Sequence, residues 1–205
     1  MVPAKSSVMG PNRKSRLRGC WHTIVACTLL ALALLTPSGS APASLRLAGF
    51  EAHNNFGVVL EGALLRSGAP SRAFLEYVRD RYGVRTVVDL RNPVGPVEGP
   101  LIQREERWTV ELGLNHINYP MPPLPDADRA VDLVQSLVAE SSAPVLMHCQ
   151  GGKDRTGTLV ALIRLREGRD YQSTLEEMKR YRHNPARLVD VQTYLRSRFA
   201  ERQTL

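Results

Sequence analysis

One short run of the chain, residues 148–157, brings together residue types that can bind and attack an anion. It reads His-Cys-Gln-Gly-Gly-Lys-Asp-Arg-Thr-Gly, so five residues separate Cys149 from Arg155. A loop of that length can wrap around one tetrahedral anion, and Gly151 and Gly152 allow its N–H groups to turn inward. The planar guanidinium of Arg155 can bind two oxygens of the anion at once, which a lysine cannot do. The spacing therefore predicts a phosphate-binding loop.

The chemistry expected of this loop depends on Cys149. The positive field of such a loop favours the thiolate form of a cysteine, and a thiolate beneath a bound phosphate is a nucleophile directed at phosphorus. Thr156 can donate its hydroxyl to the sulfur when the cysteine later acts as a leaving group. Taken alone, Cys149 is also compatible with a small hydrophobic residue buried beside a strand. The residues predicted to bind phosphate are Gln150, Gly151, Gly152, Lys153, Arg155 and Thr156.

A leaving oxygen also needs a proton, and three carboxyl groups are candidates to supply it. Asp154 lies within the loop beside Arg155, although it could instead hold the loop's shape through backbone hydrogen bonds. Asp126 opens a predicted helix, where an N-cap is its natural role. Asp128 falls in the first turn of that helix, where the helix dipole favours a carboxylate without any catalysis. We rank Asp154 first and Asp126 second, ahead of Asp128 or a water molecule.

Other polar residues are assigned supporting roles. His148 is expected to orient the loop through backbone hydrogen bonds rather than to transfer a proton. Arg66, Asp89 and Arg91 are expected to form one buried polar network behind the loop, because charged groups at strand ends need partners. The other histidines after residue 43, His53, His116 and His183, are too scattered along the chain to predict a metal site. No metal or other cofactor is predicted.

The elements that must position this loop read as one α/β domain. Strands alternate with helices after residue 45, beginning with a predicted hairpin over residues 56–66. Such alternation predicts a mainly parallel central sheet flanked by helices, with the Cys-x5-Arg loop between a central strand and the helix that follows it. The expected strands cover residues 84–90, 116–119 and 145–147, and the expected helices begin near Ser71, Leu101, Asp126 and Thr158, with a last helix marked by Leu188, Val191, Leu195 and Phe199.

The first 43 residues have the pattern of a secretory signal peptide. A basic stretch without Asp or Glu precedes an apolar run over residues 21–35, and Ala41-Pro42-Ala43 offers a small-residue cleavage site. A membrane anchor is the alternative, although 15 helical residues reach only about 22 Å of the roughly 30 Å hydrocarbon core. We therefore expect residues 44–205 to form a single exported domain, periplasmic or secreted, which retains Cys149 but not Cys20 and Cys27.

Composition narrows the classes of protein that fit. The chain has 205 residues, 43% of them hydrophobic and 23% charged, which is the composition of a globular protein. Five Lys and Arg residues among the first 45 residues contribute most of the formal charge of +7. The predicted domain itself therefore gives no indication of nucleic-acid binding. The three cysteines of the full chain are too few for a disulfide-stapled scaffold or a multi-cysteine zinc site. Membrane association is expected only through an uncleaved N-terminal segment.

The run 148–157 resembles the signature loop of the cysteine-dependent tyrosine and dual-specificity phosphatase superfamily. Leu-Arg-Ser-Gly-Ala-Pro-Ser at 65–71 and Val-Arg-Thr-Val-Val-Asp-Leu-Arg at 84–91 extend the resemblance to its small bacterial dual-specificity branch, over roughly residues 54–183. The resemblance implies a phosphocysteine at Cys149 and no metal. Members usually supply the acid from an Asp soon after a Trp-Pro or Tyr-Pro step. Here Tyr119-Pro120 provides that step, but residues 121–125 contain no carboxylate.

Together these features predict a phosphate monoester hydrolase. The resemblance implies phosphotyrosine or phosphoserine/threonine proteins as substrates, and Lys153-Asp154 is similar to members that also accept phosphoinositides. A module that binds phosphorylated ligands without turnover is one alternative, and a sulfurtransferase-like cysteine enzyme is another. The five-residue spacing and Thr156-Gly157 favour the phosphatase over the second alternative.

Overall fold

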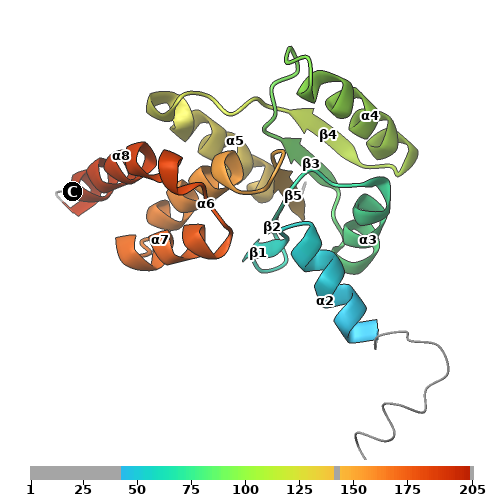
Figure 1. Ribbon diagram of the computed structural model, residues 1–205, viewed down its shortest axis with the longest axis horizontal. Coiled ribbons are helices and arrows are strands. Elements are labelled where there is room, and N and C mark those ends of the chain that lie inside the picture. Colours follow the sequence, from blue (N-terminus) through green and yellow to red (C-terminus); the bar gives the residue numbers. More distant parts are fainter. Residues whose placement is uncertain (1–42, 141–143, 204–205) are drawn as a thin grey trace, which may run out of the picture. The chain divides into compact units, whose positions relative to one another are not determined.

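The computed structural model describes residues 43–140 and 144–203, which are built around a five-stranded sheet (Figure 1). Its order is β1-β2-β5-β3-β4, and every neighbouring pair is parallel except β1 and β2. The mainly parallel sheet expected from the sequence is thus confirmed. The strands are β1 (Gly57–Leu60), β2 (Leu64–Ser67), β3 (Thr86–Asp89), β4 (Asn115–Asn118) and β5 (Val145–His148).

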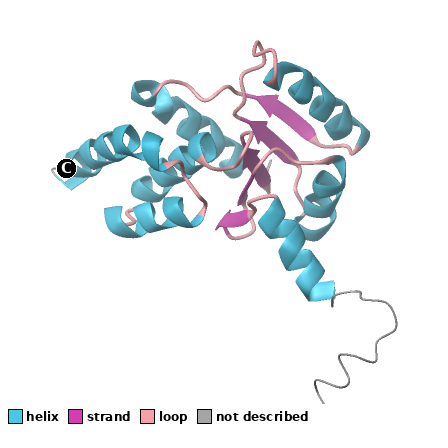
Figure 2. Ribbon diagram, in the orientation of Figure 1, coloured by secondary structure: helices cyan, strands magenta, loops and turns pink. Residues whose placement is uncertain are grey.

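Helices cover both faces of this sheet (Figure 2). One face packs against α3 and α4, and the other against α5 and α6, with α7 and α8 packed on α6 (Figure 1). The helices are α2 (Ala43–His53), α3 (Arg72–Tyr82), α4 (Glu98–Glu111), the 3-10 turn η1 (Leu124–Asp126), α5 (Ala127–Ala139), α6 (Asp154–Arg166), α7 (Tyr171–Arg180) and α8 (Pro185–Gln203).

The central strand β5 is apolar because both of its faces are covered. Leu146 packs with the α3 and α4 side, whereas Met147 packs with α5 and α6, and both side chains are fully buried. Successive residues of a strand point to opposite faces, so a strand covered on both sides needs apolar residues at consecutive positions. This burial fixes the end of β5, where the loop with Cys149 begins.

Local signals placed several helix ends correctly. The Phe74 N–H donates to Ser71 Oγ at 3.2 Å, and Gly83 ends the helix with φ at +71°. The helix expected over 101–112 begins three residues earlier, at Glu98, with Pro100 in its first turn, where a missing N–H costs nothing. Asp126 precedes α5 as expected, but its side chain makes no capping hydrogen bond.

The proposed signal segment, residues 1–43, lies almost entirely outside the described residues. In the part of the chain that the structure describes, no helix has the length and apolar character needed to cross a membrane.

Candidate active site

The structure sets Cys149 between the end of β5 and the start of α6. Its side chain is buried within the core cluster that includes Met147. Residues from two distant turns hold the following loop from outside. Asn55, in the turn before β1, donates through Nδ2 to the carbonyls of Gly151 and Gly152 at 3.2 and 3.0 Å, and the N–H of Ala69, just after β2, donates to the Gln150 carbonyl at 3.1 Å. These carbonyls therefore point away from the loop's interior, which leaves its N–H groups for an anion.

Gly152 is the position at which the loop needs glycine. Its φ is +64°, and a Cβ there would lie 2.5 Å from the Ser67 carbonyl oxygen. Any side chain would therefore combine a strained backbone with a collision against the neighbouring strand.

The Arg155 guanidinium is held by a residue that the sequence analysis did not single out. Glu98, in the first turn of α4, accepts from Nη1 through Oε2 at 2.9 Å and from Nη2 through Oε1. Nη1 also donates to the Leu90 carbonyl at 3.3 Å, and Glu98 Oε2 accepts the Asn92 N–H at 2.9 Å. The hydrogen bond with Arg155 holds the pKa of Glu98 below its ordinary value.

This arrangement leaves half of the guanidinium available to a ligand. Glu98 approaches the two terminal nitrogens of Arg155 end-on. The opposite edge, formed by Nε–H and the second hydrogen of Nη2, is the side-on edge that matches two oxygens of a phosphate. Glu98 can therefore fix the orientation of Arg155 without competing for that edge.

Thr156 lies in the first turn of α6 and does not make the expected hydrogen bond to the sulfur. Its Oγ1 is buried and makes no hydrogen bond to Cys149 Sγ or to any other described residue. A buried hydroxyl without a partner is uncommon, and this one is free to donate to a group that enters the loop.

Beneath the loop, on the side of the sheet covered by α4, lies a closed cluster of charges. Arg91 donates to Asp89 Oδ2 and to Glu105 Oε2, both at 2.6 Å, and Glu105 Oε1 lies 2.7 Å from His148 Nε2. The other ring nitrogen, His148 Nδ1, faces the Cys149 carbonyl at 3.3 Å, as expected of a residue that orients the loop. Since both ring nitrogens face acceptors, the arrangement favours the doubly protonated, cationic imidazole.

The pKa values of this cluster agree with that protonation. Burial by itself lowers the pKa of His148, but the charge and hydrogen bond of Glu105 outweigh it and raise that pKa. Burial raises the pKa of Glu105, yet His148, His116 and Arg91 together hold it well below its usual range. Two cations and two anions therefore neutralise one another in the buried cluster.

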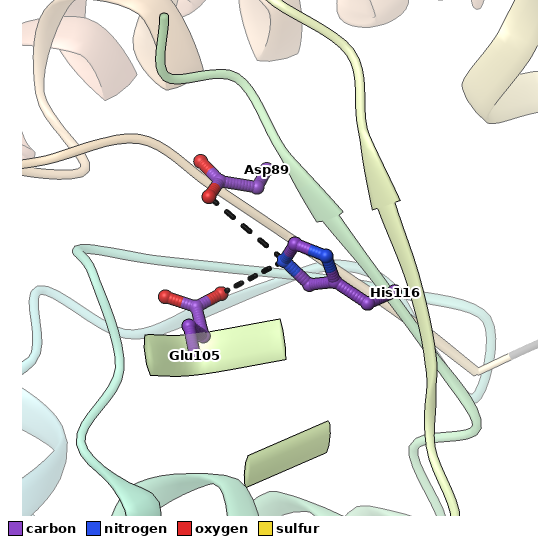
Figure 3. A group of neighbouring side chains, drawn as sticks. All are labelled: Asp89, Glu105 and His116. Carbon is purple, nitrogen blue, oxygen red and sulfur yellow. Dashed lines mark ion pairs between the residues drawn. The ribbon is translucent and has the colours of Figure 1, made fainter. Parts of the chain in front are cut away.

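His116 stands beside the cluster, and with Asp89 and Glu105 it forms a group whose ligand-type atoms lie within 4.8 Å of one another (Figure 3). Its Nε2 lies 3.5 Å from Glu105 Oε1 and 3.9 Å from Asp89 Oδ2. Both carboxylates, however, already accept from Arg91 at 2.6 Å. A metal ion would have to displace a guanidinium from a charge-balanced cluster, so these residues do not fit a metal.

The single network expected for Arg66, Asp89 and Arg91 is wrong: the structure divides it between the two faces of the sheet. Asp89 and His148 are paired in register, whereas Arg66 is paired with Met147, the residue before His148. Residues adjacent along a strand point to opposite faces, so Arg66 lies on the α6 side and Asp89 on the α4 side.

The three candidate acids have different surroundings. Asp154 Oδ1 accepts the Asn184 N–H at 2.8 Å, and Oδ2 lies 3.8 Å from Arg187. Asp126 is half exposed, with Arg129 at 3.6 Å. Asp128 pairs with Arg166 at 2.8 Å and also with Arg198.

A cavity of about 240 Å³ opens beside Arg155. Its walls come from the proline-rich loop after β4, the first turns of α6 and the start of α8, and they combine apolar and charged side chains. The lining residues are Met121, Pro122, Pro123, Leu124, Asp154, Arg155, Thr158, His183, Arg187 and Val191. Asp154 therefore faces this cavity, whereas Asp126 and Asp128 do not line it.

The buried cluster predicts a specific effect on stability. Glu105→Gln should lower the free energy of unfolding by about 3 kcal/mol at pH 7, because it leaves Arg91 and His148 short of one negative charge. The folded-state pKa of Glu105 is depressed, so its contribution is present above the unfolded value of about 4.3 and is lost as pH falls below it. Urea unfolding at pH 7 and below pH 4 measures both effects.

The neighbouring exposed residue provides the matched control for that experiment. Glu106→Gln removes the same charge from the same helix and should change stability by less than about 0.5 kcal/mol. Equal effects of the two substitutions would contradict the role assigned to the cluster.

Comparison with known proteins places this geometry in context. Residues 46–184 match the sequence model of the tyrosine phosphatase family. The inositol diphosphatase DSP3 of Arabidopsis thaliana is 28% identical over 128 residues, which make up 62% of each chain. The dual specificity protein phosphatase TpbA of Pseudomonas aeruginosa is 46% identical over 56 residues, 27% of this chain and 26% of the relative. The chain thus matches less than two thirds of the length of either protein.

Solved structures share the fold. The core catalytic domain of the PP-IP phosphatase SIW14 from S. cerevisiae superposes with a TM-score of 0.55 at 19% identity, over 70% of this chain and 84% of that one. The P. aeruginosa TpbA structure gives a TM-score of 0.53 at 24% identity, over 66% of this chain and 80% of that one.

Proposed function

Because the chain belongs to the tyrosine phosphatase family, we propose that it hydrolyses phosphate monoesters through a phosphocysteine intermediate at Cys149. The observation that carries this proposal is the placement of Cys149 at the carboxyl end of β5, directly before a loop whose carbonyls are turned outward. The carboxyl ends of parallel strands and the N-terminus of a following helix are where anions bind in α/β proteins.

In the first step, the Cys149 sulfur attacks phosphorus. An S–P bond forms as the ester P–O bond breaks, and the leaving oxygen takes up a proton. The loop N–H groups and the free edge of Arg155 bind the three remaining oxygens, so that they stabilise the charge that spreads over them. In the second step, water attacks phosphorus, the P–S bond breaks, and the thiolate returns as inorganic phosphate leaves.

Two carboxyl groups remain candidates for the acid, and each has one advantage. Asp154 lines the cavity beside Arg155, but its Oδ1 is engaged by the Asn184 N–H. Asp126 lies outside the cavity lining but is free of the capping bond that was its competing role. Asp128 is paired with two arginines, which argues against it as a proton donor.

A comparison of two leaving groups identifies the acid. Replacing the true acid by Asn should slow hydrolysis of an alkyl phosphate by about 100-fold, slow an activated aryl phosphate far less, and flatten the basic limb of the pH profile. We expect this pattern for Asp154→Asn, whose amide oxygen still accepts the Asn184 N–H. If Asp126→Asn shows the pattern instead, the acid is Asp126; if neither does, water supplies the proton.

The substrates proposed are phosphorylated proteins and inositol phosphates, including phosphoinositides. Met121, Leu124 and Val191 give the cavity an apolar wall that suits an aromatic ring, while Arg187 adds a second cation for further phosphate groups. The names of the relatives point in the same two directions, to protein phosphatases and to inositol diphosphatases. Assays with phosphotyrosine peptides, inositol phospholipids and soluble inositol polyphosphates separate these classes.

Phosphate release and sulfur transfer, measured side by side, separate the two other functions that the sequence left open. A binding module would retain phosphorylated ligands without releasing phosphate, and a sulfurtransferase-like enzyme would transfer sulfur from a thiosulfate-type donor. The paired Arg155 and Glu98 favour phosphoryl transfer, because their geometry presents a bidentate edge to a phosphate.

We further propose that residues 1–43 direct export. This rests on the sequence alone, from its basic start and apolar run to Ala41-Pro42-Ala43. Mass spectrometry of the protein isolated from its native cell should find an N-terminus near Ser44. A chain that keeps Met1 and remains in the cytosol would contradict export, and one that keeps Met1 in the membrane would indicate the anchor.

A further inference from the structure

Arg66 is a buried cation that lacks a carboxylate partner. Its side chain, on β2, has no exposed surface. Nη2 donates to the Gly152 carbonyl at 2.5 Å, and the guanidinium stacks 3.7 Å from the centre of the Tyr181 ring. Nε and Nη1 are buried, and neither has a hydrogen-bond partner among the described residues. Burying a charge with no opposite charge beside it costs free energy of folding. We therefore expect Arg66 to have a function that offsets this cost.

The position of Arg66 in the sheet points to its neighbour. Arg66 pairs in register with Met147, whose side chain faces α6. Cys149 follows two residues later and packs in the same core cluster as Met147. Side chains two residues apart along a strand point to the same face of a sheet. Cys149 therefore lies on the same face as Met147 and Arg66, the face that α6 covers.

Arg155 and the cations of the cluster on the opposite face of the sheet already have carboxylate partners. Arg155 is paired with Glu98, and the buried cluster on the opposite face contains as many anions as cations. Within residues 43–140 and 144–203, Arg66 is the fully buried arginine for which no carboxylate lies within ion-pair distance. One uncompensated positive charge thus stands beside one cysteine that can become negative.

We propose that Arg66 is the buried countercharge of the Cys149 thiolate. It acts as a positioning residue in two ways: one N–H fixes the carbonyl of Gly152, and the positive charge favours ionisation of the sulfur before any substrate arrives. This rests on the proposed function insofar as the thiolate is the nucleophile, but ionisation of Cys149 can be measured without turnover.

With the charged groups that surround it, Arg66 remains a cation at neutral pH. The pKa of Arg66 is lowered to about 10, chiefly by burial. The charges of Tyr181, Glu177 and Cys149 oppose this lowering, and the charge of Arg164 adds to it. Glu177 is itself engaged by Arg164 at 2.9 Å. His183, on the turn that follows α7, packs near the same space against Gly157, and burial lowers its pKa, so it adds no charge at pH 7.

Three substitutions separate the charge of Arg66 from its hydrogen bond. Arg66→Lys keeps a cation and a donor, Arg66→Gln keeps a donor without charge, and Arg66→Met removes both while preserving the apolar stem. The readout is the rate at which iodoacetamide alkylates Cys149 in the full chain, measured against pH, since only the thiolate reacts. Circular dichroism checks that each variant is folded.

We expect the pH midpoint of alkylation to rise by about one unit or more in Arg66→Gln and Arg66→Met, and to change little in Arg66→Lys. Arg166→Gln is the control, because Arg166 lies at the far end of α6 and pairs with Asp128 and Asp132; its midpoint should match that of the wild type. If Arg66→Gln fails to fold, Arg66→Met carries the test, since apolar replacement of a buried charge is often tolerated.

Two results would overturn the proposal. One is a midpoint for the neutral variants that equals that of the wild type, and the other is an equal shift in Arg66→Lys and Arg66→Gln, which would assign Arg66 a purely structural role. If the alkylation midpoints shift as predicted but the wild-type chain releases no phosphate from any substrate, the proposed function fails while the assignment of Arg66 stands.

Discussion

Cys149→Ser is expected to abolish turnover while leaving the loop able to bind phosphate. The serine hydroxyl stays protonated at neutral pH and is a poor nucleophile without an adjacent base, whereas the thiolate attacks directly. The rate should therefore fall by at least about 10⁴-fold. The outward hydrogen bonds of Asn55 and Arg66, which shape the loop, do not involve the sulfur.

Steady-state hydrolysis of an aryl phosphate measures the loss of activity, and calorimetric titration with phosphate or vanadate measures the retained binding. Wild-type turnover in Cys149→Ser would overturn the mechanism. Loss of both turnover and binding, together with a changed circular dichroism spectrum, would instead show that the substitution had disturbed the fold.

The second large effect is expected of Arg155→Lys, which should lose about 10³-fold in kcat. A lysine can keep a charge near Glu98 or near the phosphate, but it cannot offer an end-on edge to Glu98 and a side-on edge to the phosphate at once. The loss should fall mainly on kcat, because the fork matters most for the charge distribution of the transition state.

Arg166→Lys, on the same helix and paired with Asp128 and Asp132, provides the matched control and should retain nearly full activity. An Arg155→Lys enzyme that keeps its kcat would show that a point charge suffices, and the bidentate geometry would then have no catalytic role.

Features encoded in consecutive residues could be predicted from the sequence. The apolar strand that ends at His148, the loop after it and the helix that follows depend on one short run, and so do Ser71 and Gly83 at the ends of α3. In each case the interaction joins residues a few positions apart, so residue types and spacing are enough to identify it.

Partners supplied by distant elements could not be predicted in the same way. Glu98 and Glu105 come from α4 and lie 57 and 43 positions from their partners Arg155 and His148. Nothing in their immediate neighbours distinguishes them from the exposed Glu106. One signal was available for Glu98: it is the first carboxylate after β3, in the first turn of the helix that follows that strand.

The error over Arg66 and Asp89 arose from strand register. Each residue lies near the carboxyl end of its own strand, so the sequence suggested a common network. The register pairs Arg66 with Met147 and Asp89 with His148, and this offset of a single residue sends the two side chains to opposite faces. Register depends on how the strands pack, which alternation within one strand does not reveal.

The most direct test of the account is to look for phosphate on Cys149 during turnover. The enzyme is mixed with an aryl phosphate, quenched within milliseconds, digested, and analysed by mass spectrometry, with Cys149→Ser as the blank. We predict that a peptide containing residues 148–155 carries phosphate on Cys149 when the reaction is quenched during turnover. Hydrolysis that proceeds with no phosphate on Cys149, or with phosphate on another residue, would contradict it.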